Sequence, residues 1–310
     1  MIEIVSGIVG PFQKPITVEL FKEAHTIESS DAVLVPHDAQ YFHKYPEYLD
    51  YLNQISRRKL IIFSDRGDFP KKPSLNNSIA LRVAINPGEK LNNKIVIPYN
   101  VETLSTLPLR KYSKNPVLSF VGFMPKASLG RIYKSTLQSP LHVLAGNSAV
   151  VRHLAHSKMK RTELNYRFSL RDTYGALNVQ PHDLSRIQYL ESISDSDMVL
   201  TPRGDANQSA RFYEVLSSGR IPIVPDSYIE LPKIFKSSHL PIIHFPLLIS
   251  AKDLDFMIKS HWTNISNNEN YIMLQQNIRS FFSRNLVFDK FVNNLLNLNI
   301  EEFRSMAVSN

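Results

Sequence analysis

Short apolar runs that alternate with longer amphipathic segments constrain this 310-residue chain more than any other feature. The runs are rich in β-branched residues and bounded by turn formers, as buried strands are. The segments between them, such as His43–Ser56, carry apolar residues at helical spacing. This alternation predicts an α/β fold with parallel sheets and crossover helices. The predicted strands cover Ile2–Val9, Ala32–Pro36, Lys59–Ser64, Ile95–Tyr99, Pro116–Phe123, Leu141–Gly146, Tyr166–Arg171, Asp197–Pro202, Ile221–Asp226 and Pro241–Pro246.

The length of the chain favours two domains rather than one. Leu107–Pro116 is polar, basic and proline-rich, and we interpret it as the linker. We therefore predict an N-terminal α/β domain over residues 1–110, a second α/β domain over 111–284 and a C-terminal helix over 285–310 that packs back on the domains. The tail carries a helical apolar stripe, formed by Phe288, Phe291, Val292, Leu295, Leu296 and Leu298.

Composition excludes several classes of protein. The chain has no cysteine, which excludes a disulfide scaffold and thiolate chemistry and fits a reducing compartment. The first twenty residues lack the basic and apolar regions of a signal peptide, and no apolar stretch reaches the roughly 18 residues that span a bilayer. We expect a cytoplasmic protein.

The net charge of +8 indicates an anionic partner. Nucleic acid, an anionic membrane face and a phosphorylated small molecule all fit such a charge. The basic clusters are short and lack the interleaved aromatic residues of a nucleic-acid groove. We therefore expect a phosphorylated small molecule and no nucleic acid, with peripheral contact to the inner membrane face as a further possibility.

The segment Leu200–Ser227 is predicted to form a strand, a loop, a helix and a second strand, with Gly219 ending the helix. Arg211 and Glu214 lie three residues apart on this helix, away from its apolar face. The N–H groups and partial positive charge of a helix N-terminus attract phosphate, and a carboxylate one turn deeper can accept hydrogen bonds from two ribose hydroxyls. We predict a nucleotide site; the alternative is an ordinary surface ion pair between the two residues.

Several motifs together resemble the exostosin family of glycosyltransferases. They are Phe120–Phe123, Val199–Asp205, Ser209–Val224 and Tyr228–Pro232. The family pattern is a strand ending in Pro-Arg-Gly, then Ser-x-Arg, a Glu three residues on, a small residue, Gly and Ile-Pro-Val/Ile. The resemblance is specific over residues 117–232 and looser over 31–70. One departure is Arg220, where eukaryotic members commonly have cysteine, and we expect it to matter little.

The resemblance implies a GT-B fold, in which two Rossmann-like domains face a cleft, the acceptor on the N-terminal side and the nucleotide-sugar donor on the C-terminal domain. The chain lacks the membrane anchor and stem of eukaryotic exostosins, so it resembles a bacterial or viral relative. The implied donor-binding residues are Gly122, Arg131, Arg203, Gly204, Asn207, Ser209, Arg211 and Glu214. Arg203, Ser209 and Arg211 would lie at the diphosphate, and Glu214 at the ribose. Gly122 would let the backbone approach the donor.

The resemblance also implies transfer with inversion, which needs a general base for the acceptor hydroxyl and positive charge for the leaving diphosphate. With no metal or other cofactor, Arg203, Arg211 and the helix N-terminus would supply that charge. Asp38 or Asp65 is the expected base, with His37 as a further candidate, because these residues follow predicted strands of the N-terminal domain. Each of them is also an ordinary choice for a helix cap or a turn.

Two metal-like patterns are set aside. The Asp195–Asp197 motif precedes a strand instead of following it, and His153 and His156 have no third ligand in view. The predicted function is transfer of a sugar from a UDP- or GDP-sugar to a glycan or lipid-diphosphate-linked acceptor, in surface polysaccharide synthesis. A non-catalytic nucleotide- or glycan-binding module of GT-B type is the alternative. Base recognition is expected near Arg171–Tyr174.

Overall fold

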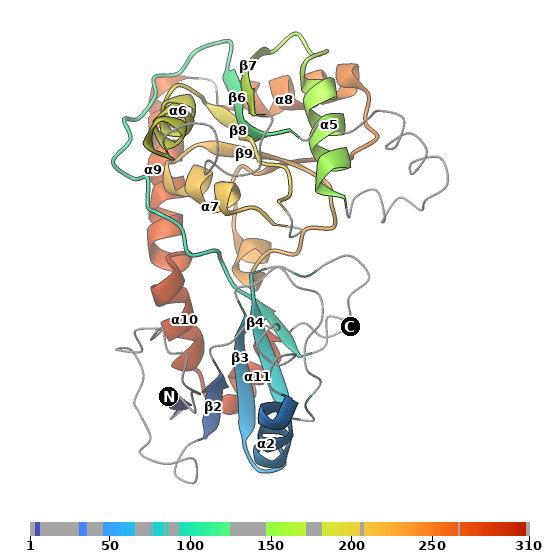
Figure 1. The fold of residues 1–310 in the computed structure, drawn as a ribbon. Helices are drawn as coiled ribbons and strands as arrows, with labels where there is room; N and C mark the ends of the chain where they lie inside the picture. The colour runs from blue at the N-terminus through green and yellow to red at the C-terminus, as the bar shows by residue number, and fades with distance from the viewer. Residues whose placement is uncertain are drawn as a thin grey trace. The chain divides into compact units, whose positions relative to one another are not determined.

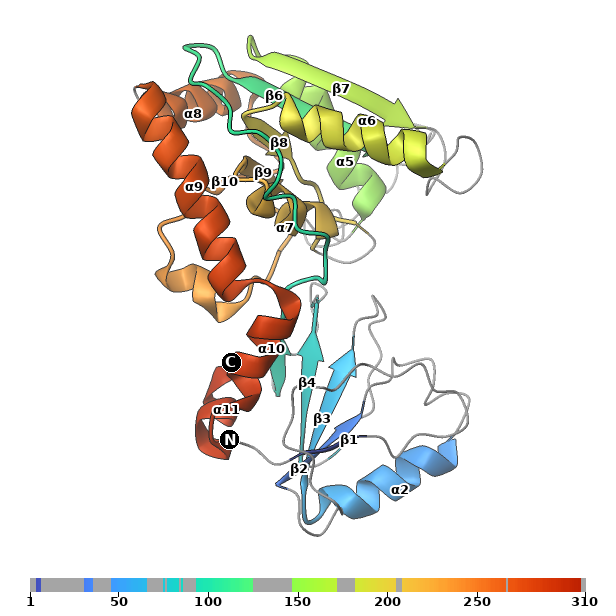
Figure 2. The same cartoon turned by 90° about the vertical axis from the view of Figure 1, so that its left-hand side faces the viewer.

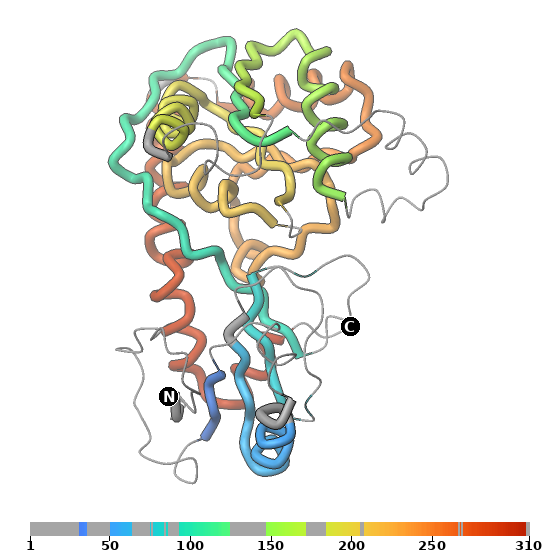
Figure 3. The backbone as a smooth tube through the Cα atoms, viewed as in Figure 1, coloured from blue at the N-terminus to red at the C-terminus, as the bar shows by residue number. Residues whose placement is uncertain are grey.

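The computed structural model describes residues 4–6, 31–35, 46–65, 75, 77–83, 85, 93–124, 147–171, 182–204, 208–265 and 267–307 (Figure 3). The chain forms two compact units. The first comprises residues 1–99, 230–237 and 287–310, and the second comprises 100–229 and 238–286. This division falls near Tyr99, whereas the sequence places the boundary at residue 110, and it assigns the C-terminal tail to the first unit.

The described residues of the first unit form a five-stranded sheet in which all neighbouring strands are parallel. Its strands lie in the order of the sequence, namely β1 (Ile4–Ser6), β2 (Ala32–Val35), β3 (Leu60–Asp65), β4 (Ser78–Arg82) and β5 (Lys94–Val96). The sequence predicts all of these except β4. The α/β class with parallel strands is confirmed.

Different helices cover the two faces of this sheet (Figure 2). Leu52 of α2 (Pro46–Ser56) packs with side chains of β2, β3 and β4 on one face. On the other face, Phe288, Phe291 and Phe303 of α10 (Phe288–Leu296) and α11 (Ile300–Met306) join the core. Right-handed crossovers between strands wound in consecutive order place their helices on one face, so the other face needs a cover from elsewhere. The apolar stripe of the tail provides it.

Among its described residues, the second unit contains a five-stranded parallel sheet with a different strand order, β10-β9-β8-β6-β7 (Figure 1). Its strands are β6 (Val117–Phe123), β7 (Asn165–Arg171), β8 (Met198–Leu200), β9 (Ile221–Pro225) and β10 (Ile243–Phe245). The chain moves from β6 outward to β7, then returns and proceeds in the opposite direction through β8. This reversal is a topological switch point, where the loops of a parallel sheet diverge and leave room for a ligand.

Helices cover the second sheet on both faces (Figure 1). They are α5 (Ser148–Met159), α6 (His182–Ser194), α7 (Ala210–Ser217), α8 (Ala251–Thr263) and α9 (Asn268–Asn285). The α6 residues Tyr189 and Ile193 share a core cluster with Val121 of β6 and Val215 of α7. Helix α5 packs with α8, and α7 packs with α9.

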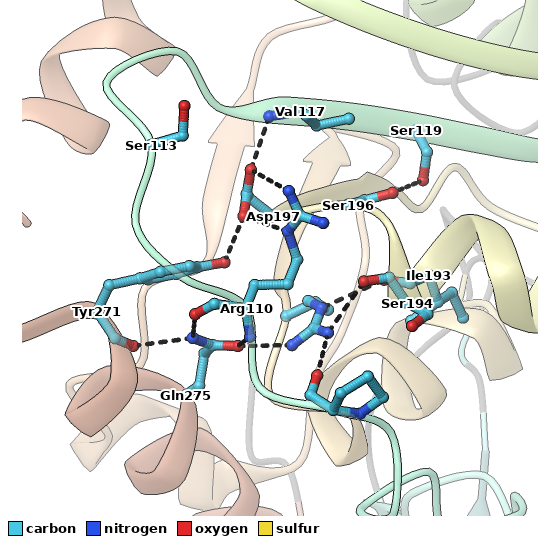
Figure 4. A network of polar contacts seen from close by, with 12 residues as sticks. Arg110, Ser113, Val117, Ser119, Ile193, Ser194, Ser196, Asp197, Tyr271 and Gln275 are labelled. Carbon is cyan, nitrogen blue, oxygen red and sulfur yellow. Dashed lines mark hydrogen bonds and ion pairs between the residues drawn. The ribbon is translucent and has the colours of Figure 1, made fainter. Parts of the chain in front are cut away.

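A buried carboxylate fastens the segment that leads into β6 (Figure 4). Asp197 is fully buried and accepts hydrogen bonds from Arg110 Nε at 2.6 Å, the Val117 backbone N–H at 2.8 Å and the Tyr271 hydroxyl at 3.0 Å. Burial and the nearby Asp197 charge raise the pKa of Tyr271, so its hydroxyl remains a donor. This aspartate therefore holds together the start of β6, the start of β8 and helix α9.

Arg220 is a second buried charged residue that joins several segments in the same region. It is 0% exposed, and its guanidinium donates to the carbonyls of Ile193 and Pro108 at 3.2 and 2.7 Å and to Gln275 Oε1 at 2.6 Å. Burial lowers the pKa of Arg220 to about 10, and the group stays charged at neutral pH. Arg220 thus joins the end of α6, the segment before β6 and α9.

Gly219 ends α7 as the sequence predicts. Its φ of +78° is the left-handed conformation that glycine adopts without strain. A Cβ at this position would also lie 2.8 Å from the Gln275 carbonyl oxygen, so the close contact between α7 and α9 requires glycine.

Replacing Arg220 with methionine should destabilise the second unit strongly. The substitution removes the Arg220 donor from the buried Pro108 carbonyl. It also removes one of two donors from the Ile193 carbonyl, which keeps the Ser196 N–H, and from Gln275 Oε1, which keeps the Arg110 N–H, and the loss should be on the order of 3 kcal/mol of unfolding free energy. Denaturant unfolding measures it. Arg284→Met, at an exposed position of α9, is the control and should stay close to wild type. Equal stability of both variants would contradict the role of Arg220.

Candidate functional site

The candidate site lies at the carboxyl ends of β6 and β8, where the strand order of the second sheet reverses. Gly122 is near the end of β6, while Arg203 and Gly204 follow β8. Arg211 and Glu214 come from α7, the helix after β8. The fold therefore gathers these five predicted residues, which are separated by up to 92 positions in the chain, at one edge of one sheet.

The loop between β8 and α7 is tied at both ends of its described part. The Gly204 backbone N–H donates to the Gln208 carbonyl at 3.3 Å, and the Tyr213 hydroxyl donates to Gln208 Oε1 at 2.6 Å. Ser209 is the N-cap residue of α7, but its side chain makes no capping hydrogen bond. The Ser209 side chain therefore does not cap the first N–H groups of α7. N–H groups at such a helix N-terminus can donate to a bound anion.

Arg211 is held in a defined position under the end of β6. Its guanidinium carbon lies 4.9 Å from the ring centre of Phe120 and 5.4 Å from that of Tyr189, and Nη2 donates to the Val121 carbonyl at 2.6 Å. Cation–π contacts of this kind stabilise a guanidinium without consuming its N–H donors. Within the described part of the chain, Arg211 Nε is buried and has no hydrogen-bond partner.

Gly122 makes room for this guanidinium. A Cβ at Gly122 would lie 2.9 Å from Arg211 Nη2 and 3.1 Å from a ring carbon of Phe120. Real Cβ atoms essentially never come as close as 2.9 Å to another heavy atom, so a larger residue must shift the end of the arginine side chain, and the Phe120 ring must yield by a few tenths of an ångström. The sequence predicts that Gly122 lets the backbone approach a ligand; the structure shows that its space is filled by Arg211.

A further arginine at this edge was not predicted from the sequence. Arg152 of α5 donates from Nε to the Arg203 carbonyl at 3.1 Å and from Nη1 to the Phe123 carbonyl at 2.8 Å. It therefore links the ends of β6 and β8. Arg203 itself is only 3% exposed. Arg152 lies on a helix without any recognisable motif, and only the fold brings it here.

Glu214 has partners that the sequence analysis also missed. Its Oε1 accepts a hydrogen bond from Arg186 Nη1 at 2.8 Å, and its Oε2 accepts one from the Tyr189 hydroxyl at 2.6 Å. Arg186 also reaches Glu102 Oε2 at 2.8 Å. Arg186 and Tyr189 both belong to α6. The ion pair that Glu214 makes among the described residues is therefore one between two helices, and not the Arg211–Glu214 surface pair that was the alternative to a nucleotide site.

The charges at this edge are mostly positive. Arg171, at the end of β7, donates to the Ser185 carbonyl at 2.7 Å, and burial and the nearby Arg211 lower its pKa. Burial lowers the pKa of Arg186, but the Glu214 charge and the hydrogen bonds to both carboxylates outweigh it, so the pKa is raised. All of these arginines remain charged at neutral pH, and the edge suits an anion.

The other predicted site residues are outside the described part of the structure. Arg131, Asn207, His37 and Asp38 belong to residues that the structure does not describe, and only the backbone of Asp65 is described. Asp65 is the last residue of β3, and its Cα pairs with that of Arg82 in β4. Its backbone therefore ends a strand in the first unit, as the sequence predicts.

The two patterns set aside from the sequence have other roles. Asp197 is the fully buried carboxylate that fastens the segment before β6. His156 Nδ1 lies 3.0 Å from the Tyr166 hydroxyl, and burial, with Lys160 and His153 nearby, lowers the pKa of His156. Among the described residues, no group of three or more His, Asp or Glu side chains could hold a metal ion.

A separate pocket of about 280 Å³ opens between α6 and the strands β6 and β7. Its lining residues are Ser119, Val121, Arg167, Phe168, Ser169, Gln188, Glu191, Ser192, Asp195 and Ser196. None of the predicted donor-binding residues is among them. In the described part of the chain, no helix has the length and apolarity needed to cross a bilayer.

Residues 131–279 match the family model of the RXYLT1 C-terminal domain, which is exostosin-like. This match covers a little under half of the chain and contains the loop after β8 and all of α7. It supports the resemblance to exostosins that the sequence motifs indicate. No curated protein matches the chain.

Solved structures match over most of the chain with low identity. The apo lipopolysaccharide outer core galactosyltransferase WaaB has a TM-score of 0.45 and 12% identity, over 86% of this chain and 74% of that one. TarM has a TM-score of 0.40 and 13% identity, over 81% of this chain and 57% of TarM. MurG of Acinetobacter baumannii has a TM-score of 0.37 and 11% identity, over 86% of this chain and 74% of MurG. The chain spans little more than half the length of TarM.

Gly122→Ala should weaken the binding of inorganic pyrophosphate, which calorimetric titration of the full chain can measure. The added methyl group displaces the Arg211 guanidinium, so we expect affinity to fall by about tenfold, as when one charged contact is lost. Thermal unfolding of the variant serves as the check that the fold is retained.

The double variant Gly122→Ala/Arg211→Ala makes this test specific. If Gly122 acts only by making room for Arg211, the double variant should bind pyrophosphate like Arg211→Ala alone. Additive losses would show that Gly122 acts independently of the arginine.

Proposed function

We propose that the chain is a glycosyltransferase of GT-B type that moves a sugar from a nucleotide-sugar donor to a glycan or lipid-diphosphate-linked acceptor. The observation that carries this proposal is the position of Arg211. Arg211 belongs to the first turn of α7, and its guanidinium lies near the carboxyl end of β6, beside the switch point of the second sheet. The exostosin-like family match over residues 131–279 supports the same conclusion.

The donor diphosphate would bind where Arg211 and the first turn of α7 come together. Helix N–H groups and a guanidinium are the groups that bind phosphate oxygens most effectively in proteins. Arg203 and Arg152 would hold the neighbouring loop and add positive charge, and the uncapped Ser209 hydroxyl would donate to a phosphate oxygen. Arg131 and Asn207 are proposed as further ligands from the sequence alone.

In the proposed reaction, the acceptor hydroxyl oxygen attacks the anomeric carbon of the donor sugar from the face opposite the diphosphate. The carbon–oxygen bond to the phosphate breaks, and its electron pair leaves with the nucleoside diphosphate. The hydroxyl proton passes to a general base, and the configuration at the anomeric carbon is inverted. Arg211 stabilises the charge that develops on the leaving diphosphate.

The general base is proposed to come from the first unit, with Asp38 and Asp65 as the main candidates and His37 as the third. Asp65 is the last residue of β3, at the carboxyl edge of a parallel sheet, the edge at which such sheets bind ligands. We propose that the reaction needs no metal ion, because arginines and the α7 N-terminus supply the positive charge. The proposed donor is a UDP- or GDP-sugar, and the proposed pathway is surface polysaccharide synthesis.

A thermal-shift panel of UDP, GDP, CDP and ADP, with and without EDTA, tests the donor class. We expect one of the first two to raise the unfolding temperature by several degrees, because a ligand at a hundred times its dissociation constant adds about 2.7 kcal/mol to stability. EDTA should leave this shift unchanged. A shift that appears only with a divalent metal would contradict the metal-independent mechanism.

Substitution of the donor site tests turnover itself. Arg211→Ala and Glu214→Ala should each reduce sugar transfer, or donor hydrolysis if no acceptor is known, by on the order of a hundredfold. The exposed Arg161→Ala is the matched control and should retain wild-type turnover. Near-wild-type turnover in both site variants would remove the proposed donor site. Donor binding without turnover in the wild type, across a panel of acceptors, would instead favour the non-catalytic binding module.

A further inference from the structure

The carboxylate of Glu214 is oriented by two donors from α6 before any ligand is present. Tyr189 Oη lies 2.6 Å from Oε2, and Arg186 Nη1 lies 2.8 Å from Oε1. The Glu214 side chain is 13% exposed, so it is shielded from most of the solvent but still reachable. Each oxygen is fixed by one hydrogen bond, and the plane of the carboxylate is therefore defined.

The two donors are themselves fixed in different ways. Tyr189 belongs to the core cluster that includes Val121, Ile193 and Val215, so apolar packing sets the position of its ring. Arg186 stacks over that ring with its guanidinium carbon 5.2 Å from the ring centre, and its Nη2 donates to Glu102 Oε2 at 2.8 Å. Burial, with the negative Glu214 beside it, raises the pKa of Tyr189, so the phenol stays protonated and donates.

The hydrogen bonds that Glu214 accepts from described residues use about half of the acceptor capacity of its carboxylate. A carboxylate offers about four lone-pair positions, and the described hydrogen bonds use one on each oxygen. A ribose presents two neighbouring hydroxyl groups, and each is a donor. The contacts from α6 therefore orient Glu214 without saturating it.

We propose that Tyr189 and Arg186 are positioning residues that hold Glu214 in the orientation that recognises the two hydroxyl groups of the donor ribose. The site then selects ribonucleoside diphosphates over their 2′-deoxy analogues. This inference rests on the proposed function, since it assigns a substrate feature to the same donor site. Glu102 contributes only through Arg186, and its replacement should have the smaller effect.

The test compares the affinities of the full chain for a nucleoside diphosphate and its 2′-deoxy analogue by calorimetric titration, with both UDP/dUDP and GDP/dGDP as probes. The wild type should bind the ribonucleotide at least about tenfold more tightly, since the analogue loses a hydrogen bond to a charged group. In Tyr189→Phe this ratio should fall to about threefold or less, while affinity for the deoxy form stays nearly unchanged. Arg186→Gln should lower the ratio as well, and Glu102→Gln should lower it less.

Tyr271→Phe is the matched control. It also removes a buried hydroxyl that donates to a carboxylate, Asp197 at 3.0 Å, but at a place outside the proposed site. It should reduce stability and keep the wild-type ratio. If Tyr189 acts only in folding, Tyr189→Phe and Tyr271→Phe should both lower the unfolding temperature, and both should keep the wild-type ratio of ribonucleotide to deoxynucleotide affinity.

The outcomes separate the two proposals. If the wild type binds neither UDP nor GDP, the donor site and this inference both fail. If it binds one of them and Tyr189→Phe keeps the full preference for ribose, the donor site stands and the positioning role is overturned. If the wild type binds the ribo and deoxy forms equally, the positioning role is overturned as well.

Discussion

The candidate site depends on one guanidinium held at the carboxyl edge of the second sheet. Arg211 is confined by Phe120, Tyr189 and the Val121 carbonyl, in a space that exists because residue 122 is glycine. A cation near the first turn of a helix is unfavourable for the helix dipole. The position becomes favourable when an anion binds there. The unfavourable interaction of Arg211 with the helix dipole therefore indicates that Arg211 belongs to an anion site.

Buried charged residues fix the segments that surround this edge of the sheet. Asp197 and Arg220 are fully buried and bind main-chain groups from segments that are far apart in the sequence. Such groups are costly to leave unpaired, so the segments they join must move together or not at all. A site that discriminates between ligands by single hydrogen bonds needs its side chains fixed by such a scaffold.

The sequence predicts much of the fold because both sheets follow simple periodic patterns. All described strands of the second unit, the end of α7 at Gly219 and the apolar stripe of the tail follow from local spacing, while the strand predicted at Leu141–Gly146 lies outside the described residues. The sequence analysis did not predict β4, because Ser78–Arg82 has a polar residue at each end and only three apolar residues between them. The partners of Glu214 and the link from Arg152 could not be predicted, since only the three-dimensional packing of α5 and α6 brings them to the site.

The most direct measurement of the central claim is a crystal structure of the chain with UDP or GDP, whichever binds. The account predicts a diphosphate at the carboxyl ends of β6 and β8, with a phosphate oxygen about 3 Å from an Arg211 nitrogen. It also predicts that the ribose hydroxyls reach Glu214 while Tyr189 and Arg186 keep their contacts. A nucleotide bound in the pocket between α6 and β7, or in the first unit, with no phosphate near Arg211, would contradict it.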